Sequence, residues 1–281
     1  MTGKSILIIG GAATGKTHYF GQLALRLEAS KGALKYYEPP ENLEPIEQAM
    51  KCLNHGRAAA HTVGHTTNKV VLPIEFQDGA RARLEWPDYA GERLKDLVSR
   101  RHGGSDWAED ARKSHAWLLF VRHDQMRSGR DLLNRPVLDI LKERREPNGK
   151  EVPWMPQAQV IELLQMLLFL RRASLRSQLH APILGIALSC YDQLPERERF
   201  SQPGDAFKAM APMLAHFIES NWAASARFVI GLSALGRPLD KEKADENFVD
   251  TGPAANGWII TPQGQENTDL TWPLVELLRK A

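Results

Sequence analysis

The sequence contains little cysteine, and its cysteines are not arranged to bind a metal. Cys52 and Cys190 are the only two and lie far apart in the chain. They match no metal-ligand spacing, which indicates a reduced, cytoplasmic setting. A large excess of one charge is also missing, because 36 lysines and arginines stand against 34 aspartates and glutamates, a formal net charge of +2. This balance gives no specific sign of nucleic acid or of a membrane surface as a partner.

Long apolar runs, internal repeats and low-complexity segments are missing as well. The most apolar segment, 160–170, contains Glu162 and Gln165 and is followed by a pair of arginines. It is too short and too polar to cross a membrane, so we expect a buried helix, with a partner-binding face as the alternative. The apolar run near the N-terminus passes directly into a glycine-rich loop and is too short for a secretory signal, so none is expected there.

That glycine-rich loop is the strongest motif in the sequence. Residues 5–10 are typical of a buried parallel strand and residues 17–29 of a helix, and the turn between them reads G-G-A-A-T-G-K-T. It fits the pattern G-x-x-x-x-G-K-[ST] in the strand-to-helix context that gives the pattern its meaning. Backbone N–H groups converge in such a loop, and the helix N-terminus adds partial positive charge, which suits a triphosphate. The sequence therefore predicts nucleotide binding.

The residues of this loop have distinct expected roles. Lys16 is expected to pair with the β and γ phosphates and to assist phosphoryl transfer, and the Thr17 hydroxyl is expected to ligate Mg²⁺. Small side chains let the backbone approach the phosphates closely. The residues expected to bind the nucleotide here are Gly10, Gly11, Ala12, Ala13, Thr14, Gly15, Lys16, Thr17 and His18.

Further along the chain, strand-like runs alternate with helical ones. The runs 69–76 and 80–86 flank Gln77-Asp78-Gly79, a strong signal for a β-hairpin. A helical stretch at 205–222 has Asp205 as its expected N-cap and is interrupted at Pro212. The other expected elements are strands at 116–121, 182–188, 227–231 and 258–260 and helices at 157–179 and 273–279. The alternation predicts an α/β fold, with a mostly parallel sheet, helices on both faces and one antiparallel edge hairpin.

Three segments lie outside this alternation. Residues 31–68 look irregular around a short helix at 45–53, and we expect a long excursion there rather than a core element. The Arg-rich segment 122–156 is expected to be a surface insertion, and its interspersed acidic residues favour a solvated surface over a binding patch. Residues 237–281 form a C-terminal extension with a closing helix. We therefore expect a single nucleotide-binding domain over 1–281 that carries these additions.

A second phosphate motif stands at the end of the hairpin. Asp88-Tyr89-Ala90-Gly91 fits D-x-x-G, in which the carboxylate can hold Mg²⁺ through water and the glycine N–H can meet a γ-phosphate. With the loop and the hairpin, this motif makes residues 5–236 similar to the Ras-like GTPases of the translation-factor class. The resemblance implies a P-loop NTPase of Ras-like topology, with GTP and GDP as ligands and Mg²⁺ as cofactor. It also implies a magnesium-binding threonine before the hairpin, where Thr66 is preferred and Thr67 is the alternative.

The resemblance extends to the residues that read the base. The family's N/T-K-x-D motif corresponds to Ser189-Cys190-Tyr191-Asp192, in which Asp192 would accept hydrogen bonds from the guanine N1–H and 2-amino groups. Cys190 replaces the lysine whose stem covers the base, a departure that weakens the guanine assignment. The family's S-A-K motif corresponds to Ser233-Ala234-Leu235, where the Ala234 N–H would meet the guanine O6. The alternative for Asp192 is a cap of the turn before Pro195.

Hydrolysis depends on the residue directly after the D-x-x-G motif. Ras-like proteins have a glutamine there that orients the attacking water, whereas this sequence has Glu92. A carboxylate can accept a proton from water but adds negative charge beside the γ-phosphate, so we expect slow intrinsic hydrolysis. The alternative is that Glu92 is an acidic residue in the first turn of a helix. An arginine in trans, or one of Arg93, Arg100 and Arg101, would supply the missing positive charge.

These features together predict a molecular switch that hydrolyses GTP with Mg²⁺ and controls a partner protein. Contacts of Thr66 and Gly91 with the γ-phosphate would order two loops, and hydrolysis would release them. The divergent base motif and the enlarged first switch region, 31–68, resemble bacterial GTPase-like proteins of multi-component systems. Two alternatives stay open. One is a nucleotide-binding scaffold with little or no hydrolysis, favoured by Glu92 and Cys190, and the other is a P-loop ATPase, favoured by the weak base motif.

Overall fold

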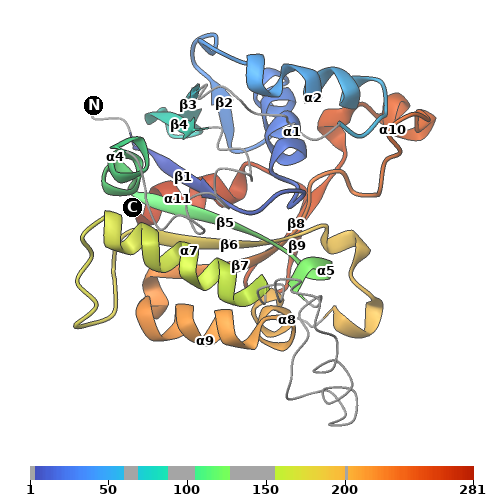
Figure 1. Cartoon of the computed structure of the whole chain (residues 1–281). Helices are drawn as coiled ribbons and strands as arrows, with labels where there is room; N and C mark the ends of the chain where they lie inside the picture. Colours follow the sequence, from blue (N-terminus) through green and yellow to red (C-terminus); the bar gives the residue numbers. More distant parts are fainter. Residues whose placement is uncertain (1–3, 60–68, 88–104, 127–155, 200–201) are drawn as a thin grey trace, which may run out of the picture.

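The computed structural model describes residues 4–59, 69–87, 105–126, 156–199 and 202–281. Within these ranges, six strands form a sheet in the order β1-β5-β6-β7-β8-β9 (Figure 1). Its parallel strands are β1 (Ile6–Ile9), β5 (Ala116–Arg122), β6 (Ile183–Ser189) and β7 (Arg227–Ser233). The strands β8 (Trp258–Ile260) and β9 (Glu266–Asn267) follow as antiparallel edge strands. The predicted α/β fold with a mostly parallel sheet is confirmed.

The parallel strands end at a common edge of the sheet. Arg122 at the end of β5 lies opposite Ser189 at the end of β6, and Ser189 lies opposite Leu232 of β7. Ile9, the last residue of β1, lies opposite Leu119 of β5, so the loop after β1 starts at the same edge. In open α/β sheets the ligand sites lie at this carboxyl edge.

The predicted hairpin forms, but it belongs to a second sheet. In that sheet β3 (Lys69–Phe76) pairs antiparallel with β4 (Arg81–Pro87), and β2 (Leu34–Tyr36) is added to β3. The turn closes because Gly79 takes a φ of 82° and Asp78 Oδ1 accepts a hydrogen bond from the Ala80 N–H at 3.0 Å, both typical of tight turns. The antiparallel strands at one edge of the main sheet are β8 and β9 instead, because the segment that contains them folds back onto β7.

Helices cover both faces of the main sheet. In Figure 1, α1, α2 and α11 lie on one side of the parallel strands, and α7, α8 and α9 lie on the other. The first turns of α2, α8, α9 and α11 contain proline, which is tolerated there because those N–H groups have no partner within the helix. The α-helices of the described residues are α1 (Lys16–Glu28), α2 (Glu44–Asn54), α4 (Ser105–Lys113), α5 (His123–Met126), α7 (Pro156–Leu170), α8 (Pro203–Met210), α9 (Pro212–Asn221), α10 (Glu246–Thr251) and α11 (Trp272–Lys280).

The most apolar segment forms α7, as expected, but the helix is shorter than predicted. It ends at Leu170 rather than at 179, since Arg172 takes a left-handed φ of 58°, a conformation that terminates helices. The leucines Leu163, Leu164 and Leu167 are buried in the core, whereas Phe169 is 82% exposed. No helix within the described ranges is long and apolar enough to cross a membrane.

Two further expectations were wrong. The helix starting at 205 begins at Pro203, so Asp205 lies in its first turn and is not the N-cap, although the break before Pro212 occurs as predicted. The segment 31–68 was expected to stay outside the core, yet Leu34 of β2 and Ile46 and Met50 of α2 belong to the buried core. The buried residues of α2 recur once per turn, which gives that helix an apolar face to pack on α1.

Candidate nucleotide-binding site

The conformation of the loop 10–17 depends on glycine at positions where the backbone is crowded or left-handed. At Gly10 a Cβ atom would lie 2.9 Å from Thr14 Oγ1 and 3.0 Å from Phe120 Cβ, so the loop passes too close to β5 for a side chain. Gly15, the N-cap of α1, has a φ of 86°, and Ala13 has a φ of 58°. Left-handed residues at these positions turn the chain sharply from β1 into α1.

Side chains of the loop itself bind its first carbonyl oxygens. Lys16 Nζ donates hydrogen bonds to Gly10 O at 2.7 Å and to Gly11 O at 2.6 Å. Thr14 Oγ1 also donates to Gly11 O, at 2.9 Å. The ammonium group of Lys16 is thereby fixed within the loop that the sequence predicts to hold phosphates.

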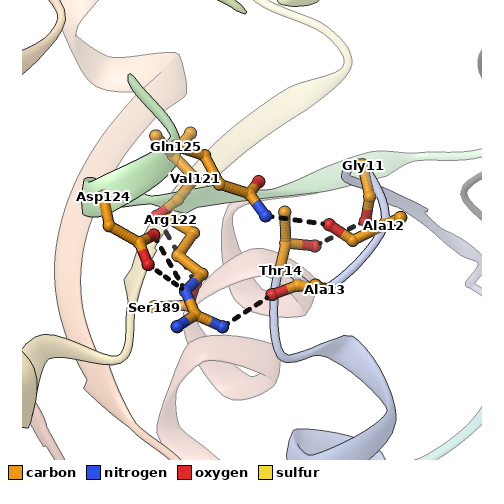
Figure 2. A network of polar contacts seen from close by, with 9 residues as sticks. All are labelled: Gly11, Ala12, Ala13, Thr14, Val121, Arg122, Asp124, Gln125 and Ser189. Carbon is orange, nitrogen blue, oxygen red and sulfur yellow. Dashed lines mark hydrogen bonds and ion pairs between the residues drawn. The ribbon is translucent and has the colours of Figure 1, made fainter. Parts of the chain in front are cut away.

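Two side chains just after the buried part of β5 bind the next carbonyls of the loop (Figure 2). Arg122 Nη1 donates to Ala13 O and Gln125 Nε2 donates to Ala12 O, both at 3.1 Å. Arg122 Nε in turn donates to the carboxylate of Asp124 at 2.9 and 3.1 Å. The expectation that Arg122 lies on a solvated surface was wrong, since its side chain is only 25% exposed. The signal that was missed is its position, directly at the carboxyl end of a central strand.

The residues predicted to read guanine meet at the ends of β6 and β7. Ser233 Oγ donates to Asp192 Oδ1 at 2.7 Å and accepts a hydrogen bond from the Gly236 N–H at 3.0 Å. Arg199 donates to Asp192 O at 2.7 Å and fixes the backbone there. Asp192 Oδ2 is buried and has no donor among the described residues. A buried carboxylate oxygen is unfavourable until a donor reaches it, so the site fits a ligand that presents N–H groups.

Asp192 bonds to Ser233 rather than capping the turn before Pro195, which was its alternative role. Beside it, Cys190 takes a left-handed φ of 54° and is half-buried. Burial raises the pKa of the Cys190 thiol, whereas the Arg122 guanidinium lowers it and the carboxylates of Asp192 and Asp124 raise it, with a raised pKa as the result. A raised pKa keeps the thiol neutral, and neutral thiols are poor nucleophiles.

The segment after β7 packs closely against the loop that follows that strand. Gly257 has a φ of 87°, and a Cβ atom there would lie 2.4 Å from Ala234 O, so the two backbones are in direct contact. The ring of Trp258 packs edge-to-face on Tyr191, with ring centroids 6.3 Å apart. The loop with Ala234 is therefore supported by the C-terminal extension.

A buried arginine ties this extension to the helix that follows the phosphate loop. Arg26 of α1 is 4% exposed, and its guanidinium donates to Asn256 O and Thr268 O, both at 2.6 Å, and to Gly257 O at 3.3 Å. Because α1 begins at the phosphate loop, these bonds connect the phosphate loop to the segment that supports the loop with Ala234.

The remaining predicted residues are only partly within the described ranges. Thr17 and His18 lie in the first turn of α1, and His18 Nε2 accepts a hydrogen bond from the Ala59 N–H at 3.0 Å. The described residues contain no cluster of three or more His, Cys, Asp or Glu that could hold a metal ion. The predicted residues outside the described ranges are Thr66, Thr67, Asp88, Gly91, Glu92, Arg93, Arg100 and Arg101.

Comparison with known proteins adds a family match. The family model described as Double-GTPase 1 matches residues 7–277. No curated protein sequence matches the chain.

Several solved structures are similar at low identity. The Arl6 (BBS3) small GTPase from Trypanosoma brucei with bound GppNp is 11% identical, with a TM-score of 0.42 and 100% of both chains covered. The S. cerevisiae Ski7 GTPase-like domain bound to GTP is 14% identical, with a TM-score of 0.41, 83% of this chain covered and 43% of that chain. The bacterial selenocysteine-specific elongation factor EF-Sec is 12% identical, with a TM-score of 0.37, 83% of this chain covered and 26% of that chain. The protein thus spans less than half the length of the Ski7 and elongation-factor chains.

Proposed function

Since the chain belongs to the Double-GTPase 1 family, we propose that it is a molecular switch that binds GTP, hydrolyses it slowly with Mg²⁺ and controls a partner protein. One observation carries the proposal. The Asp192–Ser233 pair lies at the same sheet edge as the phosphate loop, and one buried oxygen of its carboxylate lacks a donor among the described residues.

Guanine supplies the donors that this carboxylate lacks. Its N1–H and 2-amino groups can both donate to Asp192, with Ser233 Oγ holding the carboxylate in place at 2.7 Å. The backbone N–H of Ala234 then meets the guanine O6. Adenine presents no such pair of donors, so a site built in this way favours GTP over ATP.

The phosphates lie in the loop 10–17 under this proposal. Lys16, held against Gly10 O and Gly11 O, pairs with the β and γ phosphates, and the start of α1 adds partial positive charge. Mg²⁺ would be held by the Thr17 hydroxyl together with Thr66 and Asp88, hard oxygen ligands of the kind this ion prefers. When bound, the ion neutralises negative charge on the β and γ phosphates.

The output of the switch is proposed to come from loops that sense the γ-phosphate. Thr66 and Gly91 would contact it, and their release after hydrolysis would change the surface offered to an effector protein. Glu92 replaces the glutamine that orients water, so intrinsic turnover is expected to be slow, with Arg93, Arg100, Arg101 or an arginine of another protein supplying positive charge.

Titration of the purified protein with GTP, ATP and XTP, alongside Asp192→Asn, tests the base assignment. The wild-type protein is expected to bind GTP at least tenfold more tightly than ATP, roughly the effect of one unpaired buried polar group. The Asp192→Asn protein is expected to shift toward XTP, because the amide can donate to the xanthine 2-oxo group. Equal binding of GTP and ATP would overturn the guanine assignment in favour of an ATPase.

Single-turnover hydrolysis separates the switch from a scaffold that binds nucleotide without hydrolysing it. Slow release of phosphate from GTP, lost in Lys16→Ala, is the expected result. Lys51→Ala is the matched control, because its side chain is 62% exposed on α2 and pairs with Glu47, one turn earlier on the same helix. Binding of GTP without detectable hydrolysis would support the scaffold instead.

A further inference from the structure

The base-reading motif of this chain has no lysine. Cys190 stands where the family has that residue, and Ser189 stands where an amide is usual in the family. The sheet register brings another cation to the same place, since Arg122 at the end of β5 lies directly opposite Ser189 at the end of β6. The residue that follows Ser189 is Cys190, so this cation comes from the end of the strand next to the one that leads into the base-reading motif.

Arg122 contacts the phosphate loop and lies in register with the end of the strand that leads into the base-reading motif. Its Nη1 donates to Ala13 O of the phosphate loop at 3.1 Å, and Asp124 holds its Nε (Figure 2). Its charge also reaches the base-reading side, because the Arg122 guanidinium lowers the pKa of the Cys190 thiol against the larger effect of burial. Arg122 thus bonds to the phosphate loop from a strand end that lies beside the end of β6, the strand that leads into the loop with Asp192.

We propose that Arg122 replaces the missing lysine of the base-reading motif as a positioning residue for the nucleotide. One N–H group fixes the phosphate loop at Ala13, while the planar guanidinium offers a face against which a purine or its ribose can pack. Asp124 keeps the side chain in this orientation. The inference rests on the proposed function, because it concerns how guanine nucleotide is held.

Under this proposal, a lysine at position 190 can take over the role of the Arg122 guanidinium in holding the nucleotide. Nucleotide binding lost with Arg122 should therefore be rescued by Cys190→Lys. Cys190 already has a left-handed backbone, so Cys190→Lys adds no new backbone requirement beyond that of the native cysteine. The variants are Arg122→Ala, Arg122→Lys and the double variant Arg122→Ala/Cys190→Lys. Arg197→Ala is the control, because that side chain is 84% exposed.

The measurement is the affinity and dissociation rate of a fluorescent GDP analogue, with the ADP analogue in parallel and thermal unfolding of each nucleotide-free variant. Arg122→Ala is expected to bind GDP about 10- to 100-fold more weakly, the effect of losing a charged hydrogen bond. The affinity of Arg122→Lys for GDP is expected to lie between those of Arg122→Ala and the wild-type protein. The double variant is expected to return to within about tenfold of wild type, and Arg197→Ala to match wild type.

The outcomes separate this proposal from the function on which it rests. Wild-type protein that binds neither GDP nor GTP contradicts the proposed function and this inference with it. Wild-type binding that is unchanged in Arg122→Ala overturns the inference alone. If Arg122→Ala does not fold, the comparison passes to Arg122→Lys with and without Cys190→Lys. The inference is also overturned if the folded double variant binds GDP no more tightly than Arg122→Ala, or if adding Cys190→Lys to Arg122→Lys does not raise the affinity. A merely structural arginine would show that result.

Discussion

The two leading glycines of the phosphate loop differ in how much space surrounds them. Gly10→Ala would push a Cβ to within 3.0 Å of Phe120 Cβ and 3.2 Å of Phe120 O, whereas at Gly11 the nearest atom is 3.9 Å away. We expect Gly10→Ala to lower the free energy of unfolding by about 1–3 kcal/mol, as overpacking does. Gly11→Ala is expected to change it by less than about 0.5 kcal/mol. Urea unfolding of the nucleotide-free proteins measures both, and equal effects would contradict the geometry of this loop.

Ser233 and Ser189 offer a second comparison of similar side chains. Ser233→Ala removes the donor to Asp192 Oδ1 at 2.7 Å and the acceptor of the Gly236 N–H, so we expect a loss of about 1–3 kcal/mol in unfolding free energy. Ser189→Ala removes only a 3.5 Å contact with Val121 O and is expected to change little. Chemical denaturation measures the first effect, and GTP titration should show weaker binding in Ser233→Ala. A larger loss of unfolding free energy in Ser189→Ala than in Ser233→Ala would contradict the importance of the bond between Ser233 and Asp192.

The meeting of Asp192 and Ser233 could be predicted from sequence, whereas the role of Arg122 could not. Both motif residues lie at or just after the ends of strands that a parallel sheet brings side by side, so their order along the chain was informative. Arg122 contacts Ala13 through a long side chain whose direction depends on Asp124 and on the left-handed φ of Ala13. Such details come from tertiary packing, so the position of Arg122 at the carboxyl end of a central strand indicates a site at that edge of the sheet but not these contacts.

At the level of helices and strands, the guanidinium of Arg26 joins α1 to the C-terminal extension. Arg26→Met would leave the carbonyls of Asn256 and Thr268 without the donor that now lies 2.6 Å away, and we expect a loss of about 3 kcal/mol in stability. Nucleotide affinity should fall as well, because Gly257 supports the loop with Ala234. Arg176→Met on the exposed surface is the control. Circular dichroism with urea gives the result, and stability equal to the control would show that the junction is held by other contacts.

Local signals predicted some elements well and others poorly. The Asp-Gly turn fixed the hairpin, and Pro212 marked the break between α8 and α9, because each acts on its own backbone. The burial of β2 and α2 was missed, since a short strand and an amphipathic helix become core elements only when a second sheet and α1 cover them. The helix α7 ends where Arg172 takes a left-handed φ, and an arginine in the sequence does not predict that conformation.

For the chain as a whole, the proposed function predicts that nucleotide stabilises the fold. GTP with Mg²⁺ at about a hundred times its dissociation constant should add about 2.7 kcal/mol to the unfolding free energy and raise Tm by about 5–10 °C. ATP should give a smaller shift, and chelation of Mg²⁺ by EDTA should reduce the shift with GTP. Differential scanning fluorimetry measures all three. Equal shifts with GTP and ATP, or none with either, would contradict the guanine switch.

The overall architecture was the part most open to prediction, because alternating strands and helices leave few ways to cover a parallel sheet. The pattern did not reveal that the hairpin leaves the main sheet while β8 and β9 close its other edge. Those pairings join segments far apart in the chain, and their register depends on packing rather than on any single motif.

The hydrogen bonds at the phosphate loop have a consequence for conformational entropy. The carbonyls from Gly10 to Ala13 already accept bonds from Lys16, Arg122 and Gln125 in the folded protein. The backbone freedom of this loop is therefore lost when the chain folds and not when a ligand arrives, so less of the interaction energy is spent on ordering. A loop that is rigid beforehand can also serve as the fixed point against which other segments of the protein move.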